Sequence, residues 1–429
     1  MSTATGMRAV VQISGPALPA ISFAARLPAA ICPIGTLLML TELNGIGAAG
    51  ITAGMLWTGQ AVGGPFLGRY ADRRGHRPVI LAASLANAAA IAVLVVSALT
   101  AMPLPVQVAL AGAVGVTVPQ IGPLSRTRWI VLTTPANGAG PDAARELTRR
   151  ALSFDTAVDE VGFMVGPALA GVMVVLVHPA AGLALAGALI AVFGTLFALH
   201  PTAPPGTVAP ASSTVRLLRP ALVALFAMAL LQGMVWGSAN AGTSALCAHL
   251  GATGTAGFVW GAMAVTSSAA GLLVTLRPSA LELTLQLRIA IAAQALLLLP
   301  LLVVGGFLGA AAAVAGIGLA VAPHLIAVFT LAERVAPLER MGEAMAVLGS
   351  GLIIGQGVAA LAAGQLAQHF GYHSAFVLTC GCGVGAVVVA LVFVRPGVMG
   401  LPRAARSPGR YSPSRRQMSV TNSRSSGSR

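Results

Sequence analysis

Long apolar runs follow one another along the whole chain, separated by short polar segments. Each run has about 20 residues, the length that an α-helix needs to cross the hydrocarbon core of a bilayer. Lipid-exposed backbone must satisfy its hydrogen bonds within the segment, which favours helices. We therefore predict twelve membrane-spanning helices, at approximately Leu18–Leu40, Gly47–Leu67, Val79–Leu99, Val106–Leu124, Ala151–Leu176, Ala181–Leu199, Ala221–Ala241, Ala256–Leu276, Leu285–Val304, Gly309–Leu331, Ala344–Leu366 and Ser374–Val394.

The arginines divide the polar segments into two kinds. The chain has no lysine, so its 25 basic residues are all arginine. With the N-terminus inside the cell, 24 of them fall in the tails and inner loops, and the outer loops hold none. Arg126 and Arg128 are loop residues in this interpretation, and Arg288, at the start of the ninth predicted span, is counted with the inner loop that precedes it. Arginine-rich loops stay on the cytoplasmic side, so we predict a multi-pass protein of the cell (cytoplasmic) membrane with both termini in the cytoplasm.

The composition narrows the function classes. Charged residues make up 8% of the chain and hydrophobic residues 56%, whereas soluble domains carry about 25% charged residues. A soluble enzyme, a disordered chain and a secreted disulfide scaffold are therefore excluded. The net charge of +14 does not indicate a nucleic-acid partner, because the arginines are clustered between apolar runs and aromatic residues are only 5%. The four cysteines lack zinc-ligand spacing, and we expect neither a metal nor a cofactor.

The polar segment 200–219 divides the predicted helices into two halves. It is rich in Pro, Thr, Ser and Ala, which is typical of a flexible cytoplasmic linker. We therefore predict six-helix bundles at 17–199 and 220–395. Glycines recur at corresponding places in the two halves, which favours two related bundles.

Two tails complete the predicted organisation, 1–16 and 396–429, both cytoplasmic. The second is rich in Arg, Ser, Pro and Gly without apolar period, and we predict that it is disordered. Its arginines either lie against anionic lipid headgroups or are simply solvated.

The loop between the second and third runs carries the most specific motif, Gly68-Arg-Tyr-Ala-Asp72-Arg73-Arg74-Gly75-His76-Arg77. Gly68 allows close helix approach, and Gly75 allows a positive φ. Asp72 can pair with Arg77 or accept backbone hydrogen bonds at a neighbouring helix N-terminus, as a latch made in one conformation and broken in another. The alternative is a solvated basic turn that only sets topology.

This segment resembles the signature loop of the major facilitator superfamily, which lies between spans two and three. The matching residues are Gly68, Asp72, Arg73, Gly75 and Arg77. Tyr70 stands where Leu is usual, and His76 where Arg or Lys is usual. The resemblance extends over about residues 17–395 and implies two bundles that rock about a central site, with the loop stabilising one access state.

The fifth run contains Gly162-Phe-Met-Val-Gly166-Pro167-Ala-Leu-Ala-Gly171. It resembles the Gly-Pro motif of the fifth helix in drug:proton antiporters of the superfamily, although Ala170 replaces the first residue of the final Gly-Gly. The resemblance implies a close-packed, bendable helix and favours efflux. Small residues for helix contact alone are the alternative.

Few ionisable groups lie within the predicted spans, and such groups are usually functional. Arg26 in span one and Glu160 in span five lie at a similar depth, so we predict that they pair; Asp155 and Asp159 could substitute for Glu160. One hypothesis is that a carboxylate here exchanges a proton, or that Arg26 binds an anionic group. A fixed structural ion pair is the alternative.

Further cavity candidates come from polar residues in other spans. Gln232, Trp236 and Asn240 lie four residues apart on one face of span seven, a helix that lines the cavity in the superfamily. A tryptophan flanked by amides suits an amphipathic organic molecule, and interhelical hydrogen bonding is the alternative. Gln120 and His324 are weaker candidates.

These observations predict a secondary active transporter that exports a small organic solute, with protons as the coupling ion, and not an enzyme. Without lysine the chain has no phosphate-binding G-x-x-x-x-G-K loop, which excludes primary pumping by this chain. An uptake permease for a small metabolite and a non-transporting membrane sensor are the alternatives. We expect a monomer whose partners are the small-molecule solute, protons and membrane lipid.

Overall fold

The computed structural model describes residues 13–133, 141–205, 220–276, 281–336 and 340–394, and within them it contains helices and no strand. The first group of helices is α2 (Ala17–Asn44), α3 (Ile46–Arg74), α4 (His76–Leu99), α5 (Leu104–Thr117), α6 (Ile121–Thr133), α7 (Pro141–Leu176), α8 (Ala181–Leu189), the π-helix η1 (Ile190–Gly194) and α9 (Thr195–Leu199). The second group is α10 (Pro220–His249), η2 (Thr253–Thr255), α11 (Ala256–Leu276), α12 (Leu283–Leu298), η3 (Leu299–Val303), α13 (Phe307–Val335), α14 (Met341–Phe370) and α15 (Tyr372–Phe393).

Eleven helical segments of the described residues are long and apolar enough to cross a membrane, as expected for an all-α membrane protein. The predicted second span, α3, is not among them although it has 29 residues, because its glycines and polar residues lower its hydropathy. Twelve spans therefore stay a prediction. The predicted linker and the two tails lie largely outside the described residues.

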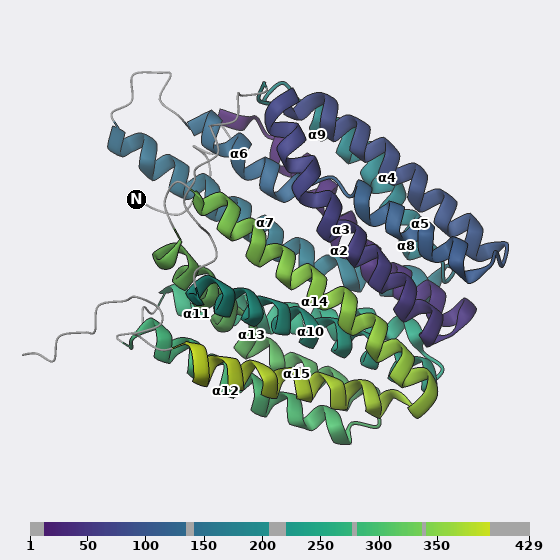
Figure 1. The fold of residues 1–429 in the computed structure, drawn as a ribbon. Coiled ribbons are helices and arrows are strands. Elements are labelled where there is room, and N and C mark those ends of the chain that lie inside the picture. The colour runs from purple at the N-terminus through teal and green to yellow at the C-terminus, as the bar shows by residue number, and fades with distance from the viewer. Residues whose placement is uncertain (1–12, 134–140, 206–219, 277–280, 337–339, 395–429) are drawn as a thin grey trace, which may run out of the picture.

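The helices form two groups that meet along a seam (Figure 1). Helices α2 to α9, purple to blue, pack mainly on one another, and so do α10 to α15, teal to yellow-green. The groups touch chiefly where α3 runs beside α14 and where α7 runs beside α11. We call the end of the molecule that carries Arg73, Arg74 and Arg334 the arginine-bearing end.

Glycines bring α3 and α14 into backbone contact far from the arginine-bearing end. A Cβ built on Gly50 would lie 2.8 Å from the carbonyl oxygen of Ala360 and 2.8 Å from the Cα of Gly364. Two glutamines of α14 hold α3 at its first turn: Gln365 Nε2 donates to the Gly47 carbonyl at 2.8 Å, and Gly47 N donates to Gln368 Oε1 at 3.2 Å. No side chain larger than hydrogen fits between the backbones at this crossing.

The fourth predicted span differs from the sequence expectation. Its helix breaks at Val118–Gln120 and continues as α6 to Thr133, so Arg126 and Arg128 are helical residues and not loop residues. Arg128 is buried: it donates to the Phe197 carbonyl at 3.0 Å, and its guanidinium lies 3.8 Å from the centre of the Phe197 ring. Arg288 is likewise on a helix, α12, where it donates to the Val394 carbonyl at 2.5 Å. Carbonyls at helix ends attract such cations, and this allows arginine inside the bundle.

Candidate functional site

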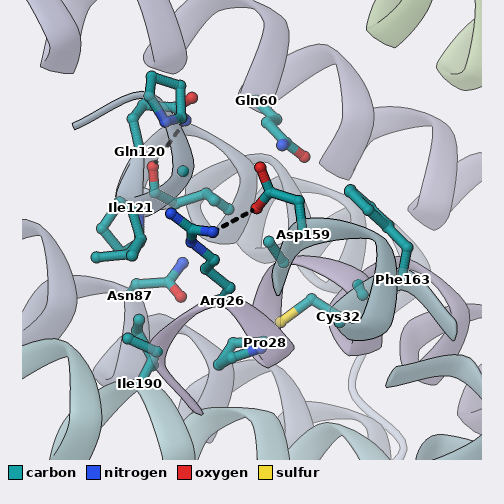
Figure 2. A pocket seen from close by; sticks show the side chains of 18 residues that line it. Arg26, Pro28, Cys32, Gln60, Asn87, Gln120, Ile121, Asp159, Phe163 and Ile190 are labelled. Carbon is teal, nitrogen blue, oxygen red and sulfur yellow. Dashed lines mark hydrogen bonds and ion pairs between the residues drawn. The ribbon is translucent and has the colours of Figure 1, made fainter. Parts of the chain in front are cut away.

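A cavity of about 190 Å³ lies within the first group of helices. Figure 2 shows Arg26 of α2 and Asp159 of α7 paired at its wall, with the amides of Gln60 and Gln120 nearby. Its polar side chains are Arg26, Gln60, Asn87, Gln120 and Asp159, and its larger apolar ones are Pro28, Cys32, Ile121, Phe163 and Ile190. An apolar cavity with a few convergent polar groups is the usual form of a small-molecule site, although this one is below the common 300–1,000 Å³.

Irregular backbone forms one side of this cavity. The break between α5 and α6 places Val118, Pro119 and Gln120 in the lining, and the π-helix η1 contributes Ile190. Non-helical backbone at membrane depth is tolerated where it lines a cavity, and single π turns inside helices are frequent at functional sites. The helix irregularities therefore coincide with the cavity.

Behind the cavity wall, Arg26 is held by two aspartates one turn apart on α7. Its Nη2 lies 2.5 Å from Asp155 Oδ1, its Nη1 donates to the Asp155 carbonyl at 2.9 Å, and Nη1 is 3.1 Å from Asp159 Oδ1. The predicted Arg26–Glu160 pair is wrong. Glu160 is the next residue on α7 and therefore points about 100° away from Asp159; it accepts a hydrogen bond from Ser268 of α11 at 3.2 Å.

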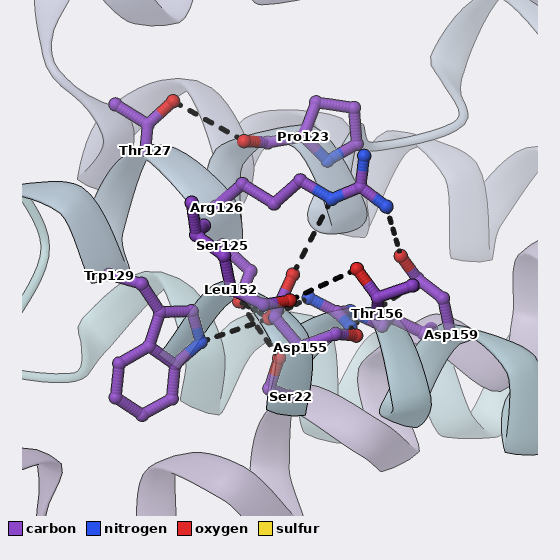
Figure 3. A network of polar contacts seen from close by, with 11 residues as sticks. Ser22, Pro123, Ser125, Arg126, Thr127, Trp129, Leu152, Asp155, Thr156 and Asp159 are labelled. Carbon is purple, nitrogen blue, oxygen red and sulfur yellow. Dashed lines mark hydrogen bonds and ion pairs between the residues drawn. The ribbon is translucent and has the colours of Figure 1, made fainter. Parts of the chain in front are cut away.

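Asp155 is enclosed on all sides (Figure 3). Its Oδ1 also accepts from Ser125 Oγ at 2.8 Å and from Trp129 Nε1 at 2.9 Å, both on α6. Ser22 of α2 is 3.3 Å from the Ser125 hydroxyl and extends the network. A buried carboxylate that accepts this many hydrogen bonds is fixed in place. Asp155 thus joins α2, α6 and α7.

Asp159 has a different environment. Its side chain is 18% exposed, against 2% for Asp155, and it faces the cavity. Arg126 of α6, which is 51% exposed, donates from Nη2 to Asp159 Oδ2 at 3.0 Å, and its Nε lies 3.7 Å from Asp155 Oδ2. Two arginines thus face two aspartates, so the cluster carries no net charge when both aspartates are ionised. Of the two carboxylates, Asp159 is the one that a solute or a proton can reach.

A second polar group lies in the other half of the molecule. Gln294 of α12 donates from Nε2 to Gln232 Oε1 at 2.9 Å, and its Oε1 is 3.0 Å from His324 Nδ1 of α13. Gln232 and His324 therefore form interhelical contacts, which supports the alternative interpretation for these two predicted residues.

The remaining atoms of this polar group have no partner among the described residues. They are Gln232 Nε2, His324 Nε2, Trp236 Nε1 and Asn240 Oδ1, all buried. Trp236 also packs against apolar clusters from both groups of helices. Unpaired buried polar atoms are costly, and water or a solute commonly satisfies them. None of these four residues lines the cavity of Figure 2, whereas the predicted Gln120 does.

The glycines of the fifth-span motif divide into three environments. Gly162 lines the cavity, and a Cβ there would meet nothing within 4 Å. Gly166 packs on Ala30 of α2, so it serves contact within the first group. Pro167 and Gly171 face η2 and the start of α11: a Cβ on Gly257 of α11 would lie 2.3 Å from the Pro167 carbonyl, and one on Gly171 would lie 2.5 Å from the carbonyl of Gly254 in η2. The motif thus forms part of the seam.

The signature-loop residues lie at the arginine-bearing end, remote from the cavity lining. They form the last turns of α3, then Gly75 with the expected positive φ of 92°, then the start of α4. Gly68 is not a close-approach point, because a Cβ there would have open space around it. Asp72, Arg73 and Arg77 are exposed, and no ion pair of Asp72 is formed within the described part of the chain. The predicted latch is therefore not closed in this conformation.

Several site residues escaped sequence reasoning. Three of them are single polar residues inside apolar runs, namely Gln60, Asn87 and Gln294. Their polarity within a predicted span could have marked them as site candidates, but the sequence analysis gave them no role. The sequence analysis ended the fourth span before Ser125, Arg126 and Trp129. The residues near Arg126 in sequence do not show that aspartates of α7 compensate its charge.

Comparisons with known proteins agree with this architecture. The family model of the Major Facilitator Superfamily matches residues 11–343. By sequence, no curated protein matches the chain. Among solved structures, a mutant of the nucleoside transporter NupG has a TM-score of 0.68 at 13% identity, covering 87% of this chain and 98% of that one.

Two further solved structures show the same fold. A bacterial homologue of the iron transporter ferroportin, in an inward-facing state, has a TM-score of 0.61 at 17% identity, covering 91% of this chain and 99% of that one. A bacterial homologue of the human lysosomal transporter Spinster, inward-facing and occupied, has a TM-score of 0.61 at 13% identity, covering 90% and 95% of the two chains. Together with the family model over most of its length, this establishes that the chain belongs to the Major Facilitator Superfamily of membrane transporters.

Proposed function

We propose that this transporter exports a small organic solute across the cytoplasmic membrane in exchange for protons, by alternating access between two six-helix bundles. The observation that carries the proposal is the buried ion cluster of Arg26, Arg126, Asp155 and Asp159 at the wall of a cavity. Ionisable groups inside membrane spans commonly mark solute and proton pathways.

The two aspartates have separate roles in this proposal. Asp155 is a positioning residue, since its enclosure by donors from α2 and α6 holds Arg26 in place. Asp159 carries the proton, since it faces the cavity and can be reached from it. A proton that neutralises Asp159 weakens its attraction to Arg26 and Arg126, and the freed guanidinium groups change how the cavity holds a solute. Proton and solute binding are thereby coupled.

We propose that the conformation described here is the one that is open toward the cytoplasm. The close contacts of the seam, at Gly47, Gly50 and Gly171, lie away from the arginine-bearing end, which we assign to the cytoplasm by the distribution of arginine. The reverse state opens this seam and brings the cytoplasmic ends of the bundles together. The exposed Asp72 then finds its partner on the opposite bundle, which makes it the latch of that second state.

The test uses protein reconstituted into vesicles that contain a pH-sensitive dye, with a pH gradient imposed and solutes added one at a time. Exchange predicts that a transported solute moves protons in the opposite direction. Asp159→Asn should abolish this proton movement, while Gln286→Ala, a half-buried position in the other half that does not line the cavity, leaves it unchanged. Solute flux that persists without proton movement in the wild type contradicts coupling.

The same vesicles distinguish the other assignments. If Glu160→Gln stops proton movement and Asp159→Asn does not, the coupling carboxylate is Glu160. Protons and solute that move in the same direction indicate an uptake permease. Solute binding without any flux indicates a sensor.

A further inference from the structure

The polar side chains of the cavity differ in which of their atoms remain available to a ligand. Asn87, 1% exposed, uses both amide hydrogens: Nδ2 donates to the Val114 carbonyl at 2.8 Å and to Thr117 Oγ1 at 3.1 Å. Because a carbonyl can only accept, this contact fixes the orientation of the amide. The Asn87 carbonyl oxygen is thus left for the cavity as an acceptor held rigidly in place.

Gln120 repeats the arrangement on the irregular backbone. Its Nε2 donates one hydrogen to the carbonyl of Val118 at 3.1 Å, which fixes the orientation of the amide and leaves Oε1 as an acceptor beside the second N–H. Gln60 lines the same cavity from α3, and its amide can turn its oxygen toward a ligand as a third acceptor. Three amides from α3, α4 and the α5–α6 break converge on one cavity, as Figure 2 shows.

The charged groups at the wall are already matched to one another. Arg26 directs both terminal nitrogens to Asp155 and Asp159, and both oxygens of Asp159 are engaged by arginine. An anionic solute and a cationic solute would each meet both Arg26 and Asp159 in this cavity, so neither finds an unmatched charge of opposite sign. Either one is buried beside a charge of its own sign, which is unfavourable. The lining therefore favours a solute without net charge.

The volume limits the size of the solute. The cavity volume of about 190 Å³ lies below the 300–1,000 Å³ that is common for sites of drug-sized molecules. This is small for the amphipathic organic molecule that Gln232, Trp236 and Asn240 suggested. Phe163 of α7, 56% exposed, offers an apolar face at the same cavity.

We propose that the solute is a small, uncharged polar molecule with several N–H or O–H donors, recognised by the carboxamide oxygens of Gln60, Asn87 and Gln120. This names the substrate class of the transport site proposed above and rests on that proposal. The donors of the ligand satisfy the amide oxygens, while one apolar face lies on Phe163. Such a site rejects a ligand that lacks the donors, because buried acceptors would stay unpaired.

The test measures binding to the purified full-length protein in detergent, as ligand-induced stabilisation against thermal unfolding. The probes are matched sets that differ mainly in charge: hexose, hexuronate and hexosamine of the same configuration, for several configurations, and uracil beside orotate. Stabilisation by uncharged members, and weaker or no stabilisation by their charged counterparts, is the expected result. Stabilisation only by charged members, or by no uncharged member, overturns the proposal.

Two substitutions assign the binding to the amides. Gln60→Leu should weaken binding of the active probe about three- to tenfold, the usual effect of one hydrogen bond. Gln60→Glu adds a negative charge and should shift the preference toward the hexosamine. Gln286→Ala is the matched control and should bind as the wild type does. Unchanged binding in both Gln60 variants overturns the assignment, and these variants do not depend on the fold-supporting bonds of Asn87.

Binding and flux separate this inference from the proposed function. If charged solutes alone are bound and are moved by a pH gradient in vesicles, proton-coupled transport stands and the solute class is wrong. If uncharged probes bind through Gln60 but none is moved, the solute class stands and transport is wrong.

Discussion

The crossing of α7 and α11 is close enough for one added methyl group to test alternating access. In Gly171→Ala the new Cβ would lie 2.5 Å from the Gly254 carbonyl oxygen, whereas ordinary contact begins near 3.4 Å. The neighbouring atom is backbone, which cannot rotate away, so the helices must separate by roughly 0.9 Å. The closed seam is therefore destabilised.

The size of the effect follows from the cost of over-packing, which is about 1–3 kcal/mol. In the proposed mechanism the seam is closed in one access state only, so this free energy bears on the equilibrium between the two states. A change of about 1–3 kcal/mol corresponds to a shift of roughly 5- to 150-fold toward the state that opens the seam.

The assay measures the distance between spin labels on cysteines introduced in place of Arg74 of α3 and Arg334 of α13, both exposed at the arginine-bearing end. The four native cysteines are replaced by alanine, so that labels attach only at these positions. Gly171→Ala should increase the population with a short distance, because the arginine-bearing ends approach when the seam opens. Gly162→Ala, on the same helix with open space at its Cβ, is the matched control. Equal distance distributions in both variants and the wild type would refute the reasoning.

Three further predictions concern the ion cluster, the seam and the loop. Asp155→Asn leaves Arg26 with one carboxylate and should lower the free energy of unfolding by about 3–5 kcal/mol, seen as a lower melting temperature by tryptophan fluorescence; an unchanged melting temperature contradicts the anchoring role. Replacing Gln365 and Gln368 by leucine removes both hydrogen bonds to Gly47, and the spin-label distances should shift as in Gly171→Ala; wild-type distances would show that the glycine contacts alone hold the seam. Asp72→Asn should reduce solute flux in vesicles while membrane insertion stays normal, and normal flux would remove its gating role.

The arrangement of helices could be predicted well from sequence, because lipid leaves the backbone few alternatives. The sixth predicted span, Ala181–Leu199, coincides with an apolar helical segment of the structure. The fourth predicted span ended too early, at Leu124, because two nearby arginines, Arg126 and Arg128, are typical of a cytoplasmic loop. Their partners, Asp159 and the Phe197 carbonyl, come from other helices. The sequence around an arginine therefore does not show that a residue far away in the chain compensates its charge.

The candidate site shows the same limit at the level of single side chains. The depth of a residue in the membrane could be estimated by counting residues from the start of its span. This count placed Arg26 and Glu160 at a similar depth. The direction around the helix axis could not be fixed without knowing which face of α7 meets α2. Successive residues differ by about 100°, so Asp155 and Asp159 share the face toward Arg26 and Glu160 turns to Ser268. The number of residues from the start of a span gives the depth of a side chain in the membrane, but only the packing of the helices shows which neighbour it faces.

The even balance of two guanidinium groups against two carboxylates has an electrical consequence. Adding one proton at Asp159 leaves the cluster with a surplus of one positive charge, and an uncharged solute brings no counter-charge. In the proposed exchange of a proton for an uncharged solute, each cycle then carries one elementary charge through the bilayer. A membrane voltage of 100 mV contributes about 2.3 kcal/mol per cycle in that case, so vesicles with a potassium diffusion potential and no pH difference should still drive the exchange.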